Sequence, residues 1–242
     1  MKKLLAASLL TFTYSSAFAI SAESVYKSSA KLFAFDNLSF TVNSTIEGND
    51  SQKKRSFMVA KKTSDNAYSL LIRFKQPRNI KCTAVLVNKK EKQTTNYIYF
   101  PALKRTRVVA KKDTNREIFG LGISYAELNS QNDIFEKLEE VTVDKDEYYK
   151  ITKLKQKMKY VYFINKKSSS IDKILTYKNN LLVKEIFIHK IIQKGTNSLI
   201  TQWSINDLKK SKKLYYSIDE KTITANIKPS MFYKNRLNKC TF

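Results

Sequence analysis

The chain has 242 residues, 42% of them hydrophobic and 27% charged, with a net charge of +24 at pH 7. This length suits one β-barrel or β-sandwich domain, and only four Gly and three Pro argue against a flexible linker between two smaller domains. The charge indicates an anionic partner, such as an acidic protein or an anionic bilayer. Alternatively, the net charge comes only from lysine pairs on the solvated faces of strands and turns and indicates no partner.

The first nineteen residues have the three parts of a secretory signal peptide. Two lysines form the positive start, residues 4–12 are apolar, and Ala17-Phe18-Ala19 has small residues at both ends of a cleavage motif. We expect cleavage after Ala19, leaving a soluble periplasmic protein of residues 20–242. No later stretch reaches about 18 consecutive apolar residues, which excludes a membrane-embedded body. Export removes nucleic acid as a natural partner, and no nucleic-acid-binding motif is present.

The remaining chain is predicted to contain one helix and then about a dozen strands. The helix covers Ser24–Phe35, with Glu23 near its start. From Leu38 onward apolar residues alternate with polar ones, as in half-buried antiparallel strands. The expected strands are Leu38–Ile46, Tyr68–Phe74, Ile80–Val87, Asn96–Phe100, Lys104–Ala110, Val141–Val143, Tyr148–Leu154, Lys159–Ile164, Ile171–Tyr177, Leu181–Ile192, Ser198–Ile205 and Leu214–Ile218.

Short polar turns join several of these strands and predict an up-and-down sheet. Further helical signals are limited to one turn at Ser124–Leu128, where Glu127 follows the capping Ser124 by three residues, and another at Asn132–Glu139. With so little helix, a dozen strands must bury their apolar sides by curving the sheet. The predicted fold is mainly β: a strongly curved antiparallel sheet that forms a half-closed barrel, with a few short helices over a cavity.

Sequence signals for catalysis are few. His189 is the only histidine, and in an apolar strand a hydrogen-bonded structural role is simpler than that of a general base. No GxSxG, HExxH, P-loop or GxGxxG motif occurs, and the acidic residues 144–147 fit a solvated turn. The sequence therefore predicts a protein that is not an enzyme and has no catalytic residues, bound metal or cofactor.

Cys82 and Cys240 are the only cysteines. In an oxidising compartment they could form one disulfide that ties the C-terminal tail to a strand. The alternative is two unpaired thiols, with Cys82 packed as a small apolar residue. Two cysteines so far apart form no metal motif.

The 14 Phe and 14 Tyr, many in alternating strands, either fill an ordinary core or line a pocket. Exposing an acyl chain to water costs about 0.8 kcal/mol per CH₂. A molecule with two or three such chains therefore needs a deep apolar cavity to cross an aqueous space.

Several blocks in the same order resemble the signature of the outer-membrane lipoprotein-sorting family, which is LolA-like. They are YIYFPALKRTRVV at 97–109, NREIFG at 115–120 and ISYAEL at 123–128, preceded by LIRF at 71–74 and KCTA at 81–84. Trp203 falls where the family usually has a tryptophan. The chain departs from the family pattern at Cys82, which replaces a glycine, at Glu117-Ile118, which replace a Gly-Ser pair, and at Ala126, where an acidic residue is common.

The resemblance implies a LolA/LolB-like half-closed barrel with a lid over an apolar cavity. The implied function is a periplasmic carrier or chaperone that shelters the acyl chains of a lipoprotein or lipid during transfer between the inner and outer membranes. The partner implied by the resemblance is an inner-membrane exporter of the RND or MMPL type, and the net charge adds transient contact with an anionic membrane surface. The alternative is a regulatory module of the same fold that senses lipid or lipoprotein.

We expect the ligand-binding residues to lie in the cavity or at its lid. Arg105 and Arg107 alternate on one strand face, where they could bind a phosphate or carboxylate headgroup or hydrogen-bond to lid carbonyls. Alternatively they are a pair of exposed strand charges. The full set of candidates is Leu70, Ile72, Phe74, Tyr99, Arg105, Arg107, Phe119, Tyr125 and Trp203.

Overall fold

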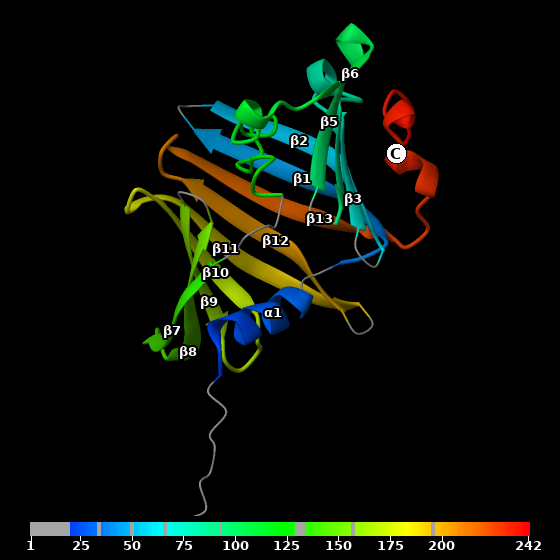
Figure 1. Ribbon diagram of the computed structural model, residues 1–242. Coiled ribbons are helices and arrows are strands. Elements are labelled where there is room, and N and C mark those ends of the chain that lie inside the picture. The colour runs from blue at the N-terminus through cyan, green and yellow to red at the C-terminus, as the bar shows by residue number, and fades with distance from the viewer. Residues whose placement is uncertain are drawn as a thin grey trace, which may run out of the picture.

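The computed structural model describes residues 20–32, 35–48, 51–64, 67–91, 93–128, 134–155, 158–194 and 197–242. The expected signal peptide, residues 1–19, lies outside this part of the chain. Thirteen antiparallel strands form one sheet that curls around a concave face (Figure 1). The expectation of a mainly β, half-closed antiparallel barrel is confirmed.

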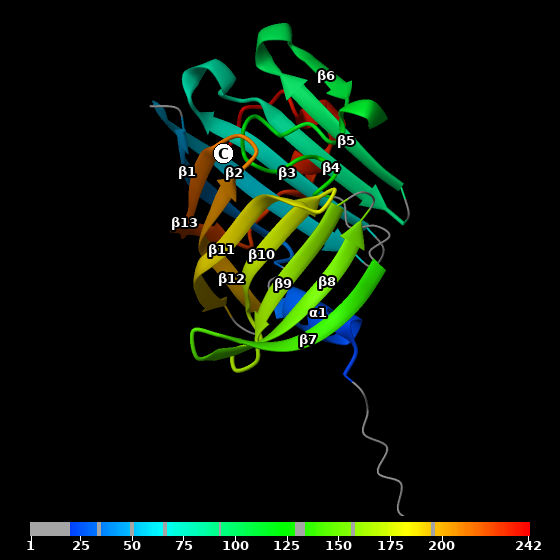
Figure 2. The ribbon, with the colours of Figure 1, turned by 90° about the vertical axis from the view of Figure 1, so that its left-hand side faces the viewer.

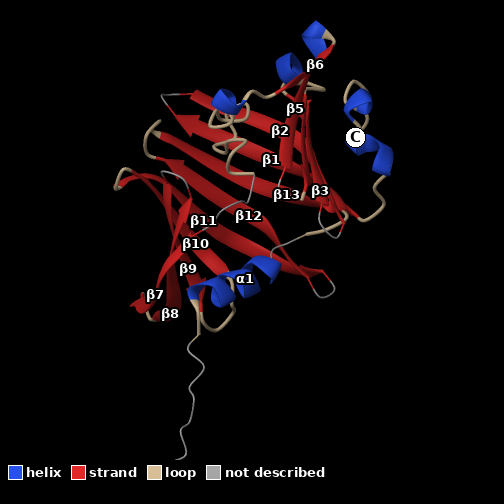
Figure 3. Ribbon diagram, viewed as in Figure 1, coloured by secondary structure: helices blue, strands red, loops and turns tan. Residues whose placement is uncertain are grey.

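Within the described residues the chain has one α-helix, thirteen strands and five short 3-10 turns (Figure 3). The helix is α1 (Ala22–Leu32). The strands are β1 (Leu38–Gly48), β2 (Ser51–Ser64), β3 (Ala67–Gln76), β4 (Ala84–Lys90), β5 (Gln93–Phe100), β6 (Arg105–Val108), β7 (Ile134–Val143), β8 (Asp146–Lys155), β9 (Met158–Asn165), β10 (Ile171–Lys178), β11 (Leu181–Lys194), β12 (Asn197–Asp207) and β13 (Lys212–Thr224). The 3-10 turns are η1 (Arg78–Ile80), η2 (Pro101–Leu103), η3 (Lys111–Asp113), η4 (Pro229–Phe232) and η5 (Lys234–Arg236).

The sheet consists of two meanders joined side by side. Its order is β6-β5-β4-β3-β2-β1-β13-β12-β11-β10-β9-β8-β7, so among the described strands β1 and β13 are the only paired neighbours that do not follow one another in sequence. Val42 lies opposite Ile218 at this junction. The edge strands are β6 and β7, which are consecutive in the chain. The segment between them therefore has to pass from one edge of the curled sheet to the other.

α1 covers one end of the concave face, against β7 to β10 (Figure 2). The hydroxyl of Ser21 accepts a hydrogen bond from the Ser24 amide at 3.1 Å and so caps the helix. The Tyr26 ring packs edge-on against Tyr162, and Lys153 Nζ donates to the Tyr26 hydroxyl at 3.0 Å. No helix in the described part of the chain is long and apolar enough to cross a membrane.

β3, β4 and the middle of β2 are covered on both faces. On the concave side Phe57, Ile72 and Val85 belong to the main core. On the outer side their sequence neighbours, such as Met58 and Leu71, form a second cluster under Phe232 and Leu237 of the C-terminal tail. The tail therefore acts as a second layer on this half of the sheet.

A disulfide joins Cys82 to Cys240 and holds the tail in place, with 5.2 Å between the two Cα atoms. Beneath the tail lies the buried side chain of Arg73, whose Nη1 donates to the Thr241 carbonyl at 2.9 Å. Burial lowers the pKa of Arg73 from its ordinary value. The tail carbonyls compensate a cation that would otherwise be costly to bury.

One expected element was wrong, and one strand was not predicted. Residues 134–139 of the expected helix Asn132–Glu139 belong to β7, and residues 132–133 lie outside the described chain. A register shift between Phe135 and Lys137 brings Phe135 and Leu138 to the same side against α1. This bulge replaces the strand spacing of two by three, which imitates a helical period. The sequence also failed to predict β2, because ten of its fourteen residues are polar and its four apolar residues are consecutive, which leaves no alternation.

Candidate functional site

The segment from Val109 to Leu128, here called the lid loop, lies across the concave face of the sheet (Figure 1). It folds back on itself, with the Ile118 amide donating to the Ile123 carbonyl at 2.8 Å. Gly120 and Gly122 have φ values of +72° and +63° at this reversal, a conformation that glycine adopts without strain. The expected turn at Ser124 is also present, since the Ser124 amide and Glu127 Oε2 are 2.8 Å apart.

The inner side of the lid loop is apolar and packs into the main core. Ile118, Leu121 and Tyr125 are buried there, and the Phe119 ring lies 5.2 Å from that of Phe74. Burial raises the pKa of Tyr125 to about 12. Loops usually run over the surface because their backbone groups need partners. A loop that fills the interior of a curled sheet therefore takes the place that a second layer of structure would occupy.

Tyr216 fixes the deepest point of the lid loop. Its buried hydroxyl donates to the Leu121 carbonyl at 2.6 Å, and its ring stacks on Trp203 at 4.8 Å. Burial raises the pKa of Tyr216 far above its ordinary value, so the phenol stays protonated and acts as a donor. Arg55 of β2 approaches the same turn: a Cβ atom at Gly120 would lie only 2.8 Å from Arg55 Nη1.

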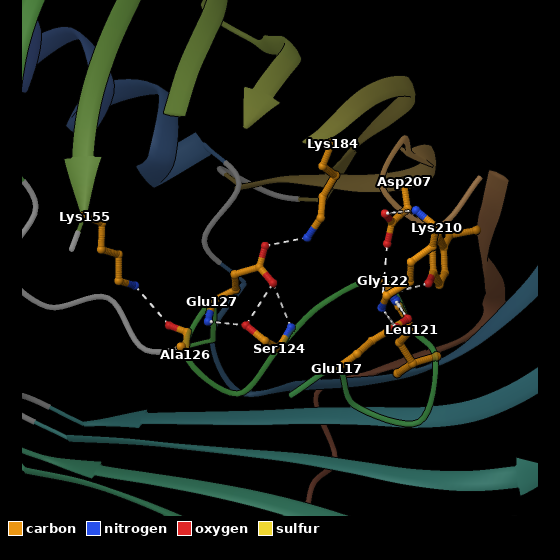
Figure 4. Close-up of polar contacts among 11 residues, drawn as sticks. Glu117, Leu121, Gly122, Ser124, Ala126, Glu127, Lys155, Lys184, Asp207 and Lys210 are labelled. Carbon is orange, nitrogen blue, oxygen red and sulfur yellow. Dashed lines mark hydrogen bonds and ion pairs between the residues drawn. The ribbon is translucent and has the colours of Figure 1, made fainter. Parts of the chain in front are cut away.

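Three lysines hold the outer rim of the lid loop (Figure 4). Lys184 Nζ lies 2.6 Å from Glu127 Oε1, and Lys210 forms an ion pair with Glu117. Lys155 Nζ donates to the Ala126 carbonyl at 3.1 Å. These contacts come from β8, β11 and the β12–β13 turn, so they fasten the loop to the half of the sheet that follows it in the chain.

A cleft of about 580 Å³ lies between the lid loop and the ends of β8 to β12. We call it the lysine cleft because its lining includes Lys155, Lys178, Lys184, Lys209 and Lys210. The acidic side chains in its lining are Glu117, Glu127 and Asp207, and its apolar side chains include Ile123, Met158, Tyr160 and Val183. Basic groups therefore outnumber acidic ones around an opening with apolar surface inside it, an arrangement suited to an amphiphile with an anionic end.

Six of the nine candidate ligand-binding residues lie together on the concave side: Leu70, Ile72, Phe74, Phe119, Tyr125 and Trp203. Tyr99 lies on the outer face, in the cluster beneath the C-terminal tail. Arg105 and Arg107 are exposed on the edge strand β6, and the described part of the structure shows no hydrogen bond from either to the lid loop. The structure thus groups the apolar candidates and separates them from Tyr99 and the two arginines.

Sequence reasoning missed Arg55, Tyr216 and the lysines of the rim. Arg55 could have been found once β2 was recognised, because it is two residues before Phe57 and so shares its face. His189 has the hydrogen-bonded structural role that the sequence favoured, since its Nε2 lies 2.8 Å from Ser204 Oγ. Ser204 pairs with Tyr215, which points away from the lid loop, so this contact lies on the outer face.

The comparisons with solved structures identify the fold. A domain from Vibrio parahaemolyticus described as an outer membrane lipoprotein-sorting protein aligns with a TM-score of 0.78 at 16% identity, over 90% of this chain and all of the other. A DUF1329 family protein from Desulfovibrio piger aligns with a TM-score of 0.76 at 15% identity, covering 89% and 98% of the two chains. The LolA superfamily protein NE2245 from Nitrosomonas europaea gives 0.71 at 14%, covering 90% and 99%.

This curled sheet with a covered concave face therefore places the protein in the LolA-like fold class, as the sequence resemblance predicted. A family model described as "Uncharacterized protein" matches residues 66–239, and the chain belongs to that family. No curated protein matches the sequence.

Replacing Tyr216 by Phe is expected to lower the free energy of unfolding by about 1–2 kcal/mol, because the buried Leu121 carbonyl loses its donor. Urea denaturation measures the change. Tyr215→Phe is a matched control, since the neighbouring side chain is 43% exposed and points to the other face. Equal effects of the two substitutions would contradict a specific role for the Leu121 contact.

The ion pair of Glu117 with Lys210 predicts that the lid loop loses stability when Glu117 is protonated at acid pH, a change called the acid step below. Burial opposes ionisation of Glu117, but hydrogen bonds from Lys210 and the Gly122 amide hold its pKa below the ordinary value of 4.5. A lowered folded-state pKa stabilises the closed loop above pH 4.5, and this contribution is lost as pH falls through the folded pKa. Below pH 4.5 the protection of residues 109–128 against hydrogen exchange, relative to the intrinsic exchange rate at each pH, should fall in the native protein. The acid step should disappear in Glu117→Gln but persist in the exposed control Glu136→Gln.

Proposed function

We propose that the protein is a periplasmic carrier that shelters the acyl chains of a lipid or lipoprotein on its concave face and acts by binding and release, without covalent chemistry. The observation that carries this proposal is the lid loop. Its apolar side chains are buried against the concave face of the sheet, while polar contacts hold the outer rim of the loop. Displacing the loop would expose an apolar surface bordered by lysines.

The lid loop would act as an internal competitor for the ligand. Its four large inner side chains, Ile118, Phe119, Leu121 and Tyr125, each gain about 1.5–3 kcal/mol from burial, or roughly 6–12 kcal/mol together. One acyl chain of about 15 methylene groups gains about 12 kcal/mol on leaving water. Because the two quantities are similar, one chain taken from water would roughly offset displacement of the loop. A bilayer shelters the chain as well as the protein does, so reburial of the loop would favour release of the cargo to a membrane without an energy source.

The lysine cleft supports an amphiphile with an anionic group as the ligand. Lys178 and Lys209 line the cleft together with the three lysines that hold the lid loop. A phosphate or carboxylate at this opening would meet several ammonium groups while its chain contacts the apolar lining. An inner-membrane exporter of the RND or MMPL type as the donor or recipient remains a proposal that rests on the sequence resemblance.

Trp203 allows a direct test, because it is the only tryptophan and lies on the concave side beside Tyr216. Phosphatidylglycerol with brominated acyl chains should quench its fluorescence when the chains bind within contact distance. In parallel, the purified protein should move a fluorescent phosphatidylglycerol from donor to acceptor vesicles faster than spontaneous exchange.

A matched pair of variants tests whether the concave face binds the chains. Ile186 of β11 belongs to the main core, whereas the next residue, Phe187, points to the opposite face and packs near Lys173. Ile186→Gln should reduce quenching and transfer at least tenfold, and Phe187→Gln should leave both near normal. Quenching without transfer would favour the sensor over the carrier. Absence of both, together with no amphiphile in an organic extract of the purified protein, would overturn the proposal.

A further inference from the structure

The segment from Pro101 to Arg116, here called the basic tip, forms an exposed end of the molecule (Figure 2). It contains η2, the edge strand β6 and η3, and its residues 109–116 are also the first part of the lid loop. The tip carries six basic residues, Lys104, Arg105, Arg107, Lys111, Lys112 and Arg116, and one acidic residue, Asp113. Asp113 pairs with Arg116 at 3.0 Å. Five basic side chains remain, and the described part of the structure shows no ion pair for any of them.

Two large aliphatic residues are exposed among these charges. Leu103, on the turn before β6, is 53% exposed, and Val108, at the end of β6, is 56% exposed. Single exposed aliphatic side chains also occur elsewhere on the surface, but these two lie among the basic side chains of the tip. Apolar residues surrounded by basic ones are the combination that inserts into the headgroup region of an anionic bilayer.

The two edges of the sheet differ in net charge. The opposite edge, the β7–β8 hairpin, carries six acidic residues and five lysines, a net charge of −1, whereas the basic tip has six basic residues and one acidic residue, a net charge of +5. An anionic surface therefore attracts the β6 edge much more strongly than the β7 edge. This would orient the protein as well as attract it.

We propose that the basic tip docks the protein on an anionic membrane surface. β6 has only four residues and has β5 as its one neighbour among the described strands, so its other edge is unpaired, and both of its faces carry exposed side chains, Arg105 and Arg107 on one and Val108 on the other. Docking at this tip places the start of the lid loop at the membrane. The inference goes beyond the proposed function, because a protein without acyl cargo would dock in the same way.

Flotation with phosphatidylglycerol vesicles, compared with neutral phosphatidylcholine vesicles, tests the docking. Each basic residue near an anionic surface contributes about fivefold to binding. Arg105→Gln with Arg107→Gln should therefore weaken binding to anionic vesicles about 25-fold. The matched control is Lys167→Gln with Lys221→Gln, two exposed lysines outside the tip with the same loss of charge, and it should change binding less than twofold. Circular dichroism checks that each variant is folded.

A second pair of substitutions separates insertion from simple charge attraction. Leu103→Ser with Val108→Ser should weaken binding several-fold at high salt, where electrostatic attraction is screened. Equal losses in the arginine variant and its lysine control would overturn the proposal, since net charge alone would then explain binding. Binding to an acidic polypeptide but to no vesicle would also overturn it in favour of an acidic protein partner. Because Arg105 and Arg107 lie away from Trp203, quenching by detergent-solubilised brominated lipid should persist in the arginine variant, which distinguishes loss of docking from loss of the carrier function.

Discussion

Removal of the Cys82–Cys240 disulfide by substitution of both residues with serine is expected to lower the free energy of unfolding by about 4–5 kcal/mol. The two cysteines are 158 residues apart, and the entropy gained by an unfolded chain on opening such a loop corresponds to about 5 kcal/mol in the chain-entropy model. Urea denaturation followed by the fluorescence of Trp203 measures the loss. The reduced native protein should show a similar loss.

Part of this effect should depend on the residue chosen at position 82. Cys82 has a φ of +65°, a left-handed conformation that favours glycine, the residue the lipoprotein-sorting family usually has there. Cys82→Gly with Cys240→Ser should therefore be more stable than the double serine variant by about 1 kcal/mol. A loss below 1 kcal/mol in the double serine variant would show that the contacts of Phe232 and Leu237 hold the tail without the covalent bond.

The second large effect is expected for Leu121→Ala in the lid loop. Leu121 is buried in the main core, and truncation of a buried leucine costs about 2–5 kcal/mol. If the loop opens as a unit, this loss weakens the closed loop rather than the whole sheet. Hydrogen exchange of residues 109–128 should accelerate at least thirtyfold, and brominated phosphatidylglycerol should bind more tightly because less energy is needed to displace the loop.

Leu208→Ala provides the control, because Leu208 lies at the end of β12 near the lysine cleft but is 47% exposed. It should change neither loop exchange nor lipid binding appreciably. If Leu121→Ala lowers global stability while loop exchange and lipid binding stay unchanged, the loop is a fixed part of the core, and its role as a displaceable lid is wrong.

The alternation of apolar residues predicted most of the strands because most of them have one covered face and one exposed face. It failed at β2, where ten of the fourteen residues are polar and the four apolar ones are consecutive, so no alternation is present. The consecutive apolar residues Phe57 and Met58 contact the concave core on one face and the cluster beneath the C-terminal tail on the other. In β7 a bulge gives Phe135 and Leu138 a helical spacing. In both strands a tertiary feature, the tail or the bulge, alters the local pattern.

The sequence predicted many of the residues that form the candidate site, but not the contacts between them. The family resemblance located the lid loop, and alternation grouped Leu70, Ile72 and Phe74. The ion pair of Glu117 with Lys210 joins residues 93 positions apart, and no local signal indicates such a partner. Tyr99 shows the limit of reasoning about strand faces, because its side depends on register and a shift of one residue exchanges inside for outside.

The position of the lid loop in the chain has a mechanical consequence. The loop begins where the edge strand β6 ends, and the chain then continues into β7, the other edge strand of the same sheet. The loop is therefore part of a strap, the connection that crosses the open side of the curled sheet and is covalently joined to an edge strand at each end. Any flattening of the sheet moves the two attachment points apart and draws the strap outward, whereas tighter curling slackens it. A partner that binds only the two edge strands would therefore be expected to change the depth of the loop and the space available to a ligand.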